Sequence, residues 1–175
     1  MNSFKELARV RRSHRAFTDE PVSEEDIKTI LTAALMSPTG KGLRKWRFAV
    51  TDNKEKIQAL SGIRTAGSRF LAGAPVVIAV LGVPAEQELW VEDGSIAAVT
   101  MQYQAEDLGL GSCWCHVRGR ESVVAGVPAE EKVKEILGIP DECSVLCLIA
   151  VGHPADERKP QDEDSLKWDQ VSYVH

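Results

Sequence analysis

The chain has 175 residues, of which 21 are Lys or Arg and 26 are Asp or Glu, giving a net charge of -5. This length predicts a single domain over residues 1–175. The acidic balance argues against nucleic-acid or anionic-membrane binding, and no apolar run approaches the ~20 residues that span a bilayer. Because the charged start of the chain does not read as a secretory signal, we expect a cytoplasmic protein.

Helix and strand signals follow one another irregularly along the chain. Caps and 3.6-residue apolar periodicity predict helices over 3–10, 23–35, 54–61, 68–73, 88–108 and 129–137. Continuous apolar or β-branched runs predict strands over 47–51, 75–81, 113–118 and 145–151. Helices outnumber strands, so the expected class is α+β, with helices around one sheet.

The four cysteines lie in or beside apolar segments whose sequence is typical of strands. Their C-x-C and C-x-x-x-C spacings match neither a zinc knuckle nor a thioredoxin-type pair, and the histidines show no metal-ligand spacing. We therefore expect no metal, and we predict buried, inert thiols, with a metal or redox role as the alternative, at Cys113, Cys115, Cys143 and Cys147.

Four of the 21 basic residues fall within 9–15, directly after the first predicted helix. One interpretation is a solvated helix end, where arginine complements the helix dipole. Another is a phosphate site, because arginine forks match phosphate oxygens and Ser13 adds a hydroxyl donor. A nucleic-acid arm is the weakest interpretation, since no aromatic platform accompanies the cluster.

Two glycine-bearing segments could bring the backbone close to a ligand. Residues 37–48 (SPTGKGLRKWRF) could do so at Gly40 and Gly42, or could form a plain connector with Trp46 in the core. Residues 109–114 (GLGSCW) could aim N–H groups at a ligand, or could be a helix C-cap followed by a buried strand. Neither segment matches a Walker or dinucleotide-binding motif.

Four segments in chain order resemble the FMN-dependent nitroreductase-like flavoproteins. They are RRSHRAF (11–17), SPTGKGLRKWRF (37–48), the helix and Gly-rich text of 92–114, and GIPDECSVLCLIAVGHP (138–154). The resemblance spans nearly the whole chain. It implies a nitroreductase-like fold with a mixed, mostly antiparallel sheet, and an intertwined homodimer with FMN at the subunit interface.

The resemblance also implies which residues bind FMN. The phosphate and ribityl chain would be bound by the basic segment, with a second phosphate ligand from the tail, and the flavin ring would lie by the loop and the third strand. The basic segment would contribute Arg11, Arg12, Ser13 and Arg15, and the tail would contribute Arg158 or Lys159. The loop beside the ring would contribute Pro38, Thr39, Gly40, Gly42 and Arg44. The third strand would contribute His116 and Val117, near which a backbone N–H would face flavin N5.

The implied activity is ping-pong hydride transfer from NADH or NADPH through the flavin to a nitroaromatic, quinone or other small acceptor, with no obligatory side-chain base. Two departures stand against it: Gly42 replaces the family's Asn, and Arg44-Lys45 replace its Gln-Pro. A non-catalytic flavin-binding protein is therefore the main alternative, and an anion-binding module without flavin is a third.

The last segment, 153–175, is polar and too poor in apolar residues to form its own core. It nevertheless holds Leu166, Trp168, Val171, Tyr173 and Val174. We therefore predict that this tail docks on the partner subunit.

Overall fold

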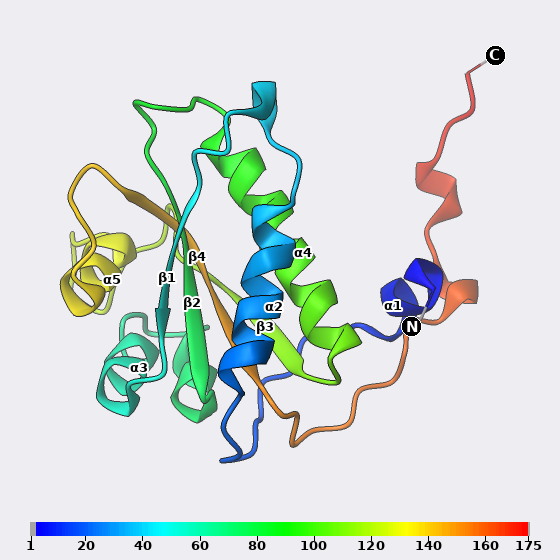
Figure 1. The fold of residues 1–175 in the computed structure, drawn as a ribbon, viewed down its shortest axis with the longest axis horizontal. Helices are drawn as coiled ribbons and strands as arrows, with labels where there is room; N and C mark the ends of the chain where they lie inside the picture. Colours follow the sequence, from blue (N-terminus) through cyan, green and yellow to red (C-terminus); the bar gives the residue numbers. More distant parts are fainter. Residues whose placement is uncertain (1–2, 175) are drawn as a thin grey trace.

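The protein is described by a computed structural model that covers residues 3–174, so Met1, Asn2 and His175 of the predicted domain lie outside the described residues. Four strands form one sheet in the order β1-β2-β4-β3: β1 (Arg47–Thr51), β2 (Val76–Gly82), β3 (Gly111–His116) and β4 (Ser144–Gly152) (Figure 1). All three strand pairs are antiparallel, and the one parallel contact in the described part of the chain is a single bridge between Ser13 and Ser112. The sheet is therefore less mixed than expected.

Five α-helices surround the sheet: α1 (Phe4–Val10), α2 (Glu24–Leu35), α3 (Lys54–Ser61), α4 (Trp90–Asp107) and α5 (Ala129–Leu137). The helices α2 and α4 cover one face and α3 and α5 the other, each pair closing its own buried cluster (Figure 1). Both faces of the central strands are covered, which is why β2 and β4 read as continuous apolar runs rather than as alternating ones. Short 3₁₀ turns lie at Gly40–Gly42, Arg69–Gly73, Glu163–Ser165 and Trp168–Gln170.

The long helix α4 packs closely on the sheet, as its small residues predict. A Cβ on Gly94 would lie 2.9 Å from the Leu146 side chain of β4, so a larger residue there would force that side chain to shift. The helix ends in a Schellman motif, in which Leu110 N–H donates to the Ala105 carbonyl at 2.8 Å and Gly109 takes a φ of +75°. A helix C-cap at Gly109 followed by a mostly buried strand is thus confirmed.

Two other expectations are settled by packing. Trp46 is 8% exposed and its indole N–H donates to the Ala34 carbonyl at 3.3 Å, so the expectation that Trp46 lies in the core is confirmed. The third strand was predicted over 113–118 and instead covers 111–116. It starts earlier because Gly111 pairs with Gly152, and it ends earlier because the chain turns back, with Arg120 N–H donating to the Val117 carbonyl.

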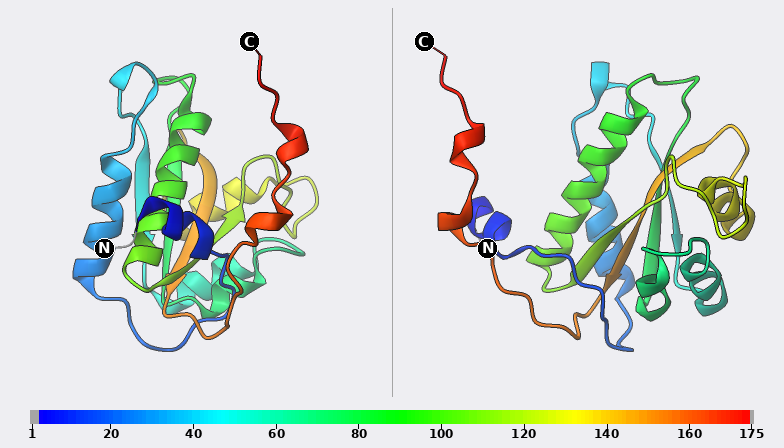
Figure 2. Two further views of the ribbon diagram at one scale, coloured as in Figure 1. Left: turned by 90° about the vertical axis from the view of Figure 1, so that its right-hand side faces the viewer. Right: turned by 180° about the vertical axis from the view of Figure 1, so that it is seen from behind.

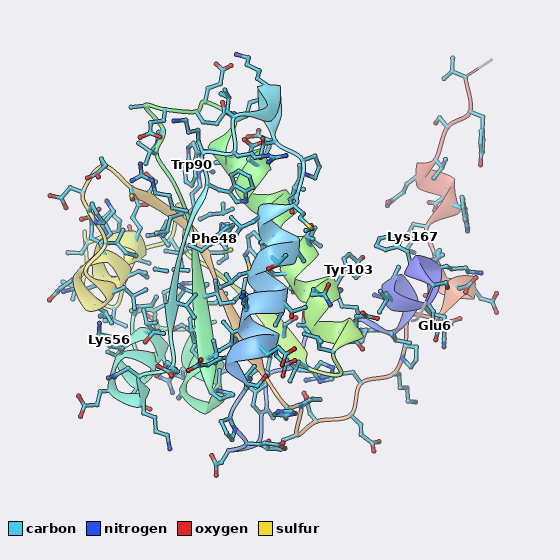
Figure 3. All side chains as sticks on the ribbon, in the orientation of Figure 1. Glu6, Phe48, Lys56, Trp90, Tyr103 and Lys167 are labelled. Atoms are coloured by element: carbon cyan, nitrogen blue, oxygen red, sulfur yellow. The ribbon has the colours of Figure 1, made fainter. Side chains whose placement is uncertain are left out.

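The last part of the tail, from about residue 162, extends away from the sheet beside α1 (Figures 1 and 2). Helix α1 itself contacts α4 through Phe4 and Tyr103, whose ring centroids lie 5.1 Å apart. Helix α1 and the tail also contact each other. They hold each other through Gln161 N–H, which donates to the Arg9 carbonyl at 2.7 Å, and through an ion pair of Lys5 with Glu163. Trp168 is 64% and Tyr173 76% exposed. Large aromatic side chains thus lie uncovered within the protomer. Figure 3 labels Lys167, which belongs to the same segment.

Candidate functional site

The basic segment lies at the end of the sheet where β3 begins and β4 ends. His14 N–H donates to the Ser112 carbonyl at 3.0 Å, and Phe17 bridges to Pro154 beyond β4. The His14 side chain crosses Gly111 so closely that a Cβ there would lie 2.9 Å from it. Backbone pairing and a glycine contact therefore position residues 11–17 against the edge of the sheet.

Three arginines and a serine lie in the neighbourhood of Cys113, the first buried thiol of β3, and Arg11 also lies over the Tyr103 ring, 5.9 Å from its centroid. Burial raises the pKa of Cys113, while the charges of Arg15, Arg11 and Arg158 and a hydrogen bond with Ser13 act against that rise. All four groups are therefore within interaction range of one sulfur atom, although Arg158 is more than 140 residues from the others in the chain. The charge density suits a phosphate, which carries close to two negative charges.

Asp156 orients this cluster. Its carboxylate accepts hydrogen bonds from His14 Nδ1 at 2.8 Å and from Arg158 Nε at 2.9 Å. Burial opposes its ionisation, but the hydrogen bonds of His14, Arg158 and the Arg15 backbone N–H together lower the pKa of Asp156. The carboxylate thus ties the tail to the basic segment and fixes the direction of the Arg158 guanidinium.

Two of the predicted phosphate ligands lie differently. Arg12 turns toward the tail, where its guanidinium donates to the Lys159 carbonyl at 3.0 Å. Lys159 is exposed and contributes this carbonyl rather than its ammonium group to the contact. The structure thus places Arg11, Ser13, Arg15 and Arg158 together, and gives Arg12 a contact that ties it to the tail.

A cleft of about 430 Å³ runs from Arg15 along β3, lined also by residues 65–67, Arg69, Phe70 and Trp114. The segment around residues 65–69 carries no recognisable motif, so the local sequence does not mark it as part of a site. This segment reaches the site because the connection from α3 to β2 passes beside β3. Contacts between segments that are far apart in the chain leave no pattern in the local sequence.

Within the described part of the chain, the edge of β3 that faces this cleft has no neighbouring strand. Val117 N–H donates to the Leu146 carbonyl of β4 at 3.3 Å, and ladder hydrogen bonds alternate in direction from residue to residue. The N–H groups of Trp114 and His116 therefore point to the free edge. Of the two residues predicted near the flavin ring, His116 presents its N–H outward, whereas Val117 uses its own within the sheet and is fully buried.

The loop expected at the flavin ring lies at the opposite end of the sheet (Figure 1). It precedes β1, where Arg47 pairs with Leu81 and Leu81 with Val145, whereas Ser112 pairs with Val151. Six residues of β4 separate these levels, about 20 Å at ~3.3 Å per residue. One protomer therefore does not bring Pro38, Thr39, Gly40, Gly42 and Arg44 to the arginine cluster.

The loop itself has an unusual backbone. Lys41 and Arg44 both take positive φ angles, 55° and 51°, which non-glycine residues rarely adopt. Arg44 N–H donates to the Thr39 hydroxyl at 3.1 Å, which closes the loop. Such left-handed residues persist where the surroundings hold them, and they are common at ligand sites.

All four cysteines are buried and free, as predicted. Burial raises the pKa of Cys115 to about 11, and that of Cys147 rises for the same reason. In the described residues 3–174, no three His, Cys, Asp or Glu side chains group in a way that could hold a metal ion. Within the same residues, none of the helices has the length and apolar character needed to cross a membrane.

Solved structures share this fold. An FMN-dependent nitroreductase from Clostridium difficile R20291 superposes with a TM-score of 0.93 at 39% identity, over 97% of this chain and 98% of its own. A nitroreductase with bound FMN from Desulfitobacterium hafniense DCB-2 superposes with a TM-score of 0.76 at 25% identity, over 100% of both chains. The fold is that of the nitroreductase-like proteins.

The sequence profile of the Nitroreductase family matches residues 8–64 and 59–153. A protein of Archaeoglobus fulgidus, provisionally named NADH dehydrogenase/NAD(P)H nitroreductase, is 32% identical over 158 residues, covering 88% of this chain and 87% of its own. The chain belongs to the Nitroreductase family.

Proposed function

We propose that the protein is an FMN-dependent NAD(P)H oxidoreductase that reduces a nitroaromatic, quinone or other small acceptor. The observation that carries this proposal is the cleft beside the free edge of β3, which Arg15 lines, with Ser13 bridged to the start of β3 and Arg158 held near His14 by Asp156. The names of the relatives support it, since they include an FMN-dependent nitroreductase and an FMN reductase (NADPH) of Bacillus subtilis.

Different residues in and near the cleft would contact different parts of the cofactor. The arginines and Ser13 would hold the phosphate, and the outward N–H of His116, three residues or about 10 Å further along β3, would face the ring. FMN held there would supply the redox chemistry, namely hydride acceptance from NAD(P)H and electron transfer to the acceptor in a second half-reaction. The chain's own part is to bind and orient, and it needs no side-chain base.

A second copy of the chain would complete the site. The loop of residues 38–44 is about 20 Å from the arginine cluster of its own protomer, so we propose that it reaches the flavin of the partner in an intertwined homodimer. The uncovered aromatic side chains of the tail fit the same arrangement. We propose a single domain over 1–175 whose residues 153–175 exchange between subunits.

The colour of the purified protein tests the cofactor. We expect the visible absorption of oxidised flavin, and its loss when NADH or NADPH is added without oxygen. A colourless protein that does not take up added FMN would contradict the proposal.

The rival function is flavin binding without catalysis. It is favoured by a loop in which Gly42 and Arg44 stand where an amide side chain would contact the ring. A yellow protein that is not bleached by either nucleotide would establish the rival, whereas bleaching followed by reoxidation with a quinone or nitroaromatic would exclude it.

A further inference from the structure

Two aromatic side chains line the same cleft and come from different elements. Trp114 belongs to β3 and Phe70 to the 3₁₀ turn Arg69–Gly73, and both line the cleft of about 430 Å³ beside the edge of the sheet. The charged residues of its lining are Arg15 and Arg69, which are both cations. Aromatic surfaces with positive charge close by suit a flat ring system that carries an anionic group.

The Trp114 indole is held in one orientation by a neighbouring ring. Trp114 and His116 are two residues apart in β3, so their side chains lie on the same face of the sheet. Trp114 Nε1–H donates to His116 Nδ1 at 3.4 Å, and the two ring planes lie within 16° of each other with centroids 6.3 Å apart. The two rings therefore lie side by side and are joined at their edges.

The same contact fixes the state of the imidazole. An indole nitrogen can only donate, so His116 Nδ1 must be the unprotonated acceptor, and the proton of the neutral ring must be on Nε2. Burial lowers the pKa of His116, and the charges of Arg120 and Arg64 lower it further, which favours the neutral ring near neutral pH. The acceptor that orients the indole is therefore stable under ordinary conditions.

The segment that carries Phe70 is fastened to the same stretch of β3. Cys115 Sγ–H donates to the Gly67 carbonyl at 3.3 Å, and Arg64 Nη1 donates to the His116 carbonyl at 2.9 Å. A Cβ on Gly67 would lie 3.3 Å from Arg64 Nη1, so the guanidinium packs on this glycine. The cleft is therefore shaped before a ligand enters it, which lowers the entropy cost of binding.

Trp114 lies between the two ends of the proposed flavin site. It is about 7 Å along β3 from Ser112, at the phosphate end, and about 7 Å from His116, whose backbone N–H we place by the ring. The indole packs on the buried cluster under α2 and α4 and also lines the cleft. We propose that Trp114 supplies the aromatic contact to the flavin ring and that His116 is a positioning residue that sets the orientation of the indole. This inference rests on the proposed function.

Titration of FMN into the full-length protein freed of flavin tests the contact. We expect Trp114→Leu to raise the Kd of FMN about tenfold, because stacking on an aromatic side chain is lost, and Trp114→Phe to retain most of the affinity. Ribose 5-phosphate carries a phosphate but no flat ring, so its Kd, measured by competition with FMN, should not change in either variant. An equal loss for FMN and ribose 5-phosphate would mean a general disturbance of the site and would overturn the inference.

Flavin emission provides a second readout, which a purely structural role of Trp114 would not move. An indole in contact with an excited flavin donates an electron to it and quenches its emission, whereas a phenyl ring does not. We therefore expect bound FMN to be brighter in Trp114→Phe than in the parent. Trp168→Phe is the matched control, since Trp168 is exposed in the tail and does not line the cleft, and it should change neither the Kd nor the emission. Unchanged FMN affinity in Trp114→Leu, or equal emission in the parent and Trp114→Phe, would overturn the contact.

A double-mutant cycle tests the role of His116. His116→Leu removes the acceptor of the indole N–H but keeps the backbone N–H that we place by the ring, and it should raise the Kd of FMN about threefold. In the Trp114→Phe background, which has no indole N–H, the same change should have no further effect. Equal effects in both backgrounds would show that His116 acts independently of Trp114 and would overturn its positioning role.

Failure of the proposed function would look different. A protein that takes up no FMN would overturn the proposed function together with this inference. A protein that binds FMN through Trp114 but is reduced by neither NADH nor NADPH would overturn the proposed function alone, because the contact concerns the ring and not its reduction. A holoprotein that either nucleotide reduces, but whose FMN affinity and emission do not depend on Trp114, would overturn this inference alone.

Discussion

The carboxylate of Asp93 on α4 accepts a hydrogen bond from the backbone N–H of Gly40 at 2.8 Å, although 53 residues separate them. Its second oxygen accepts from Gln87 Nε2 at 3.0 Å, and Gln87 also donates to the Gly40 carbonyl. Asp93 is 3% exposed. This buried network fixes the loop that we propose reaches the partner's flavin.

Replacing this carboxylate should loosen the loop. In Asp93→Asn an amide NH₂ would face one of two N–H donors, so we expect a loss of about 1–3 kcal/mol in the free energy of unfolding, with weaker FMN retention. Urea denaturation measures the first and gel filtration with absorbance the second. Asp107→Asn, exposed at the end of the same helix, should show neither effect; unchanged stability in Asp93→Asn would refute the network's role.

Removing one arginine of the cluster near Cys113 should weaken FMN binding. Arg11→Ala, Arg15→Ala and Arg158→Ala should each raise the Kd about tenfold to a hundredfold, because each charge-assisted contact to phosphate is lost. Fluorescence quenching of FMN provides the measurement.

Arg9→Ala is the control for these variants, since Arg9 pairs with Glu6 at 2.7 Å and should not contact the phosphate. Riboflavin lacks the phosphate and should bind weakly to the parent and the variants alike. If riboflavin bound as tightly as FMN, the assignment of the phosphate site would be wrong.

Shortening the tail should weaken the dimer. A chain ending at Gln161 keeps Arg158 and Asp156 but lacks Trp168 and Tyr173, whose exposed rings we expect the partner to cover. Sedimentation velocity should show a larger monomer fraction and a lower FMN content at equal protein concentration. A shortened chain that still sediments as a fully flavinated dimer would contradict the docking of the tail.

The bond between Asp156 and His14 should make stability depend on pH in acid. The folded-state pKa of Asp156 is lowered, so its contribution is complete above the unfolded value of about 3.9 and disappears as the pH falls through the lower folded value. The difference in unfolding free energy between parent and Asp156→Asn should therefore narrow below about pH 4. A difference that stays constant down to pH 2 would exclude this linkage.

The thiols should be inert in the folded protein. Burial raises the pKa of Cys115 to about 11, so little thiolate exists near neutral pH. Iodoacetamide should label the native holoprotein far more slowly than the urea-unfolded chain. Replacing all four cysteines by Ala or Ser should preserve flavin reduction in protein that folds, and a specific loss of hydride transfer would count against this prediction.

Local chemistry in the sequence was enough to locate most elements. Ser3, Ser23 and Asn53 cap α1, α2 and α3 through side-chain hydrogen bonds, and Gly109 ends α4, because each of these interactions involves residues within one turn. The strands β2 and β4 could also be predicted from the sequence, because a strand that is buried on both faces needs a continuous run of apolar residues.

Only the tertiary structure decided which charges meet. Arg158 joins Arg11 and Arg15 through the bridge of Phe17 to Pro154, and Arg64 reaches His116 across the free edge of β3. The same topology keeps the loop at Gly40 away from the basic segment. Such contacts depend on strand order and on chain crossings between distant segments, which leave no mark on residue periodicity or local spacing.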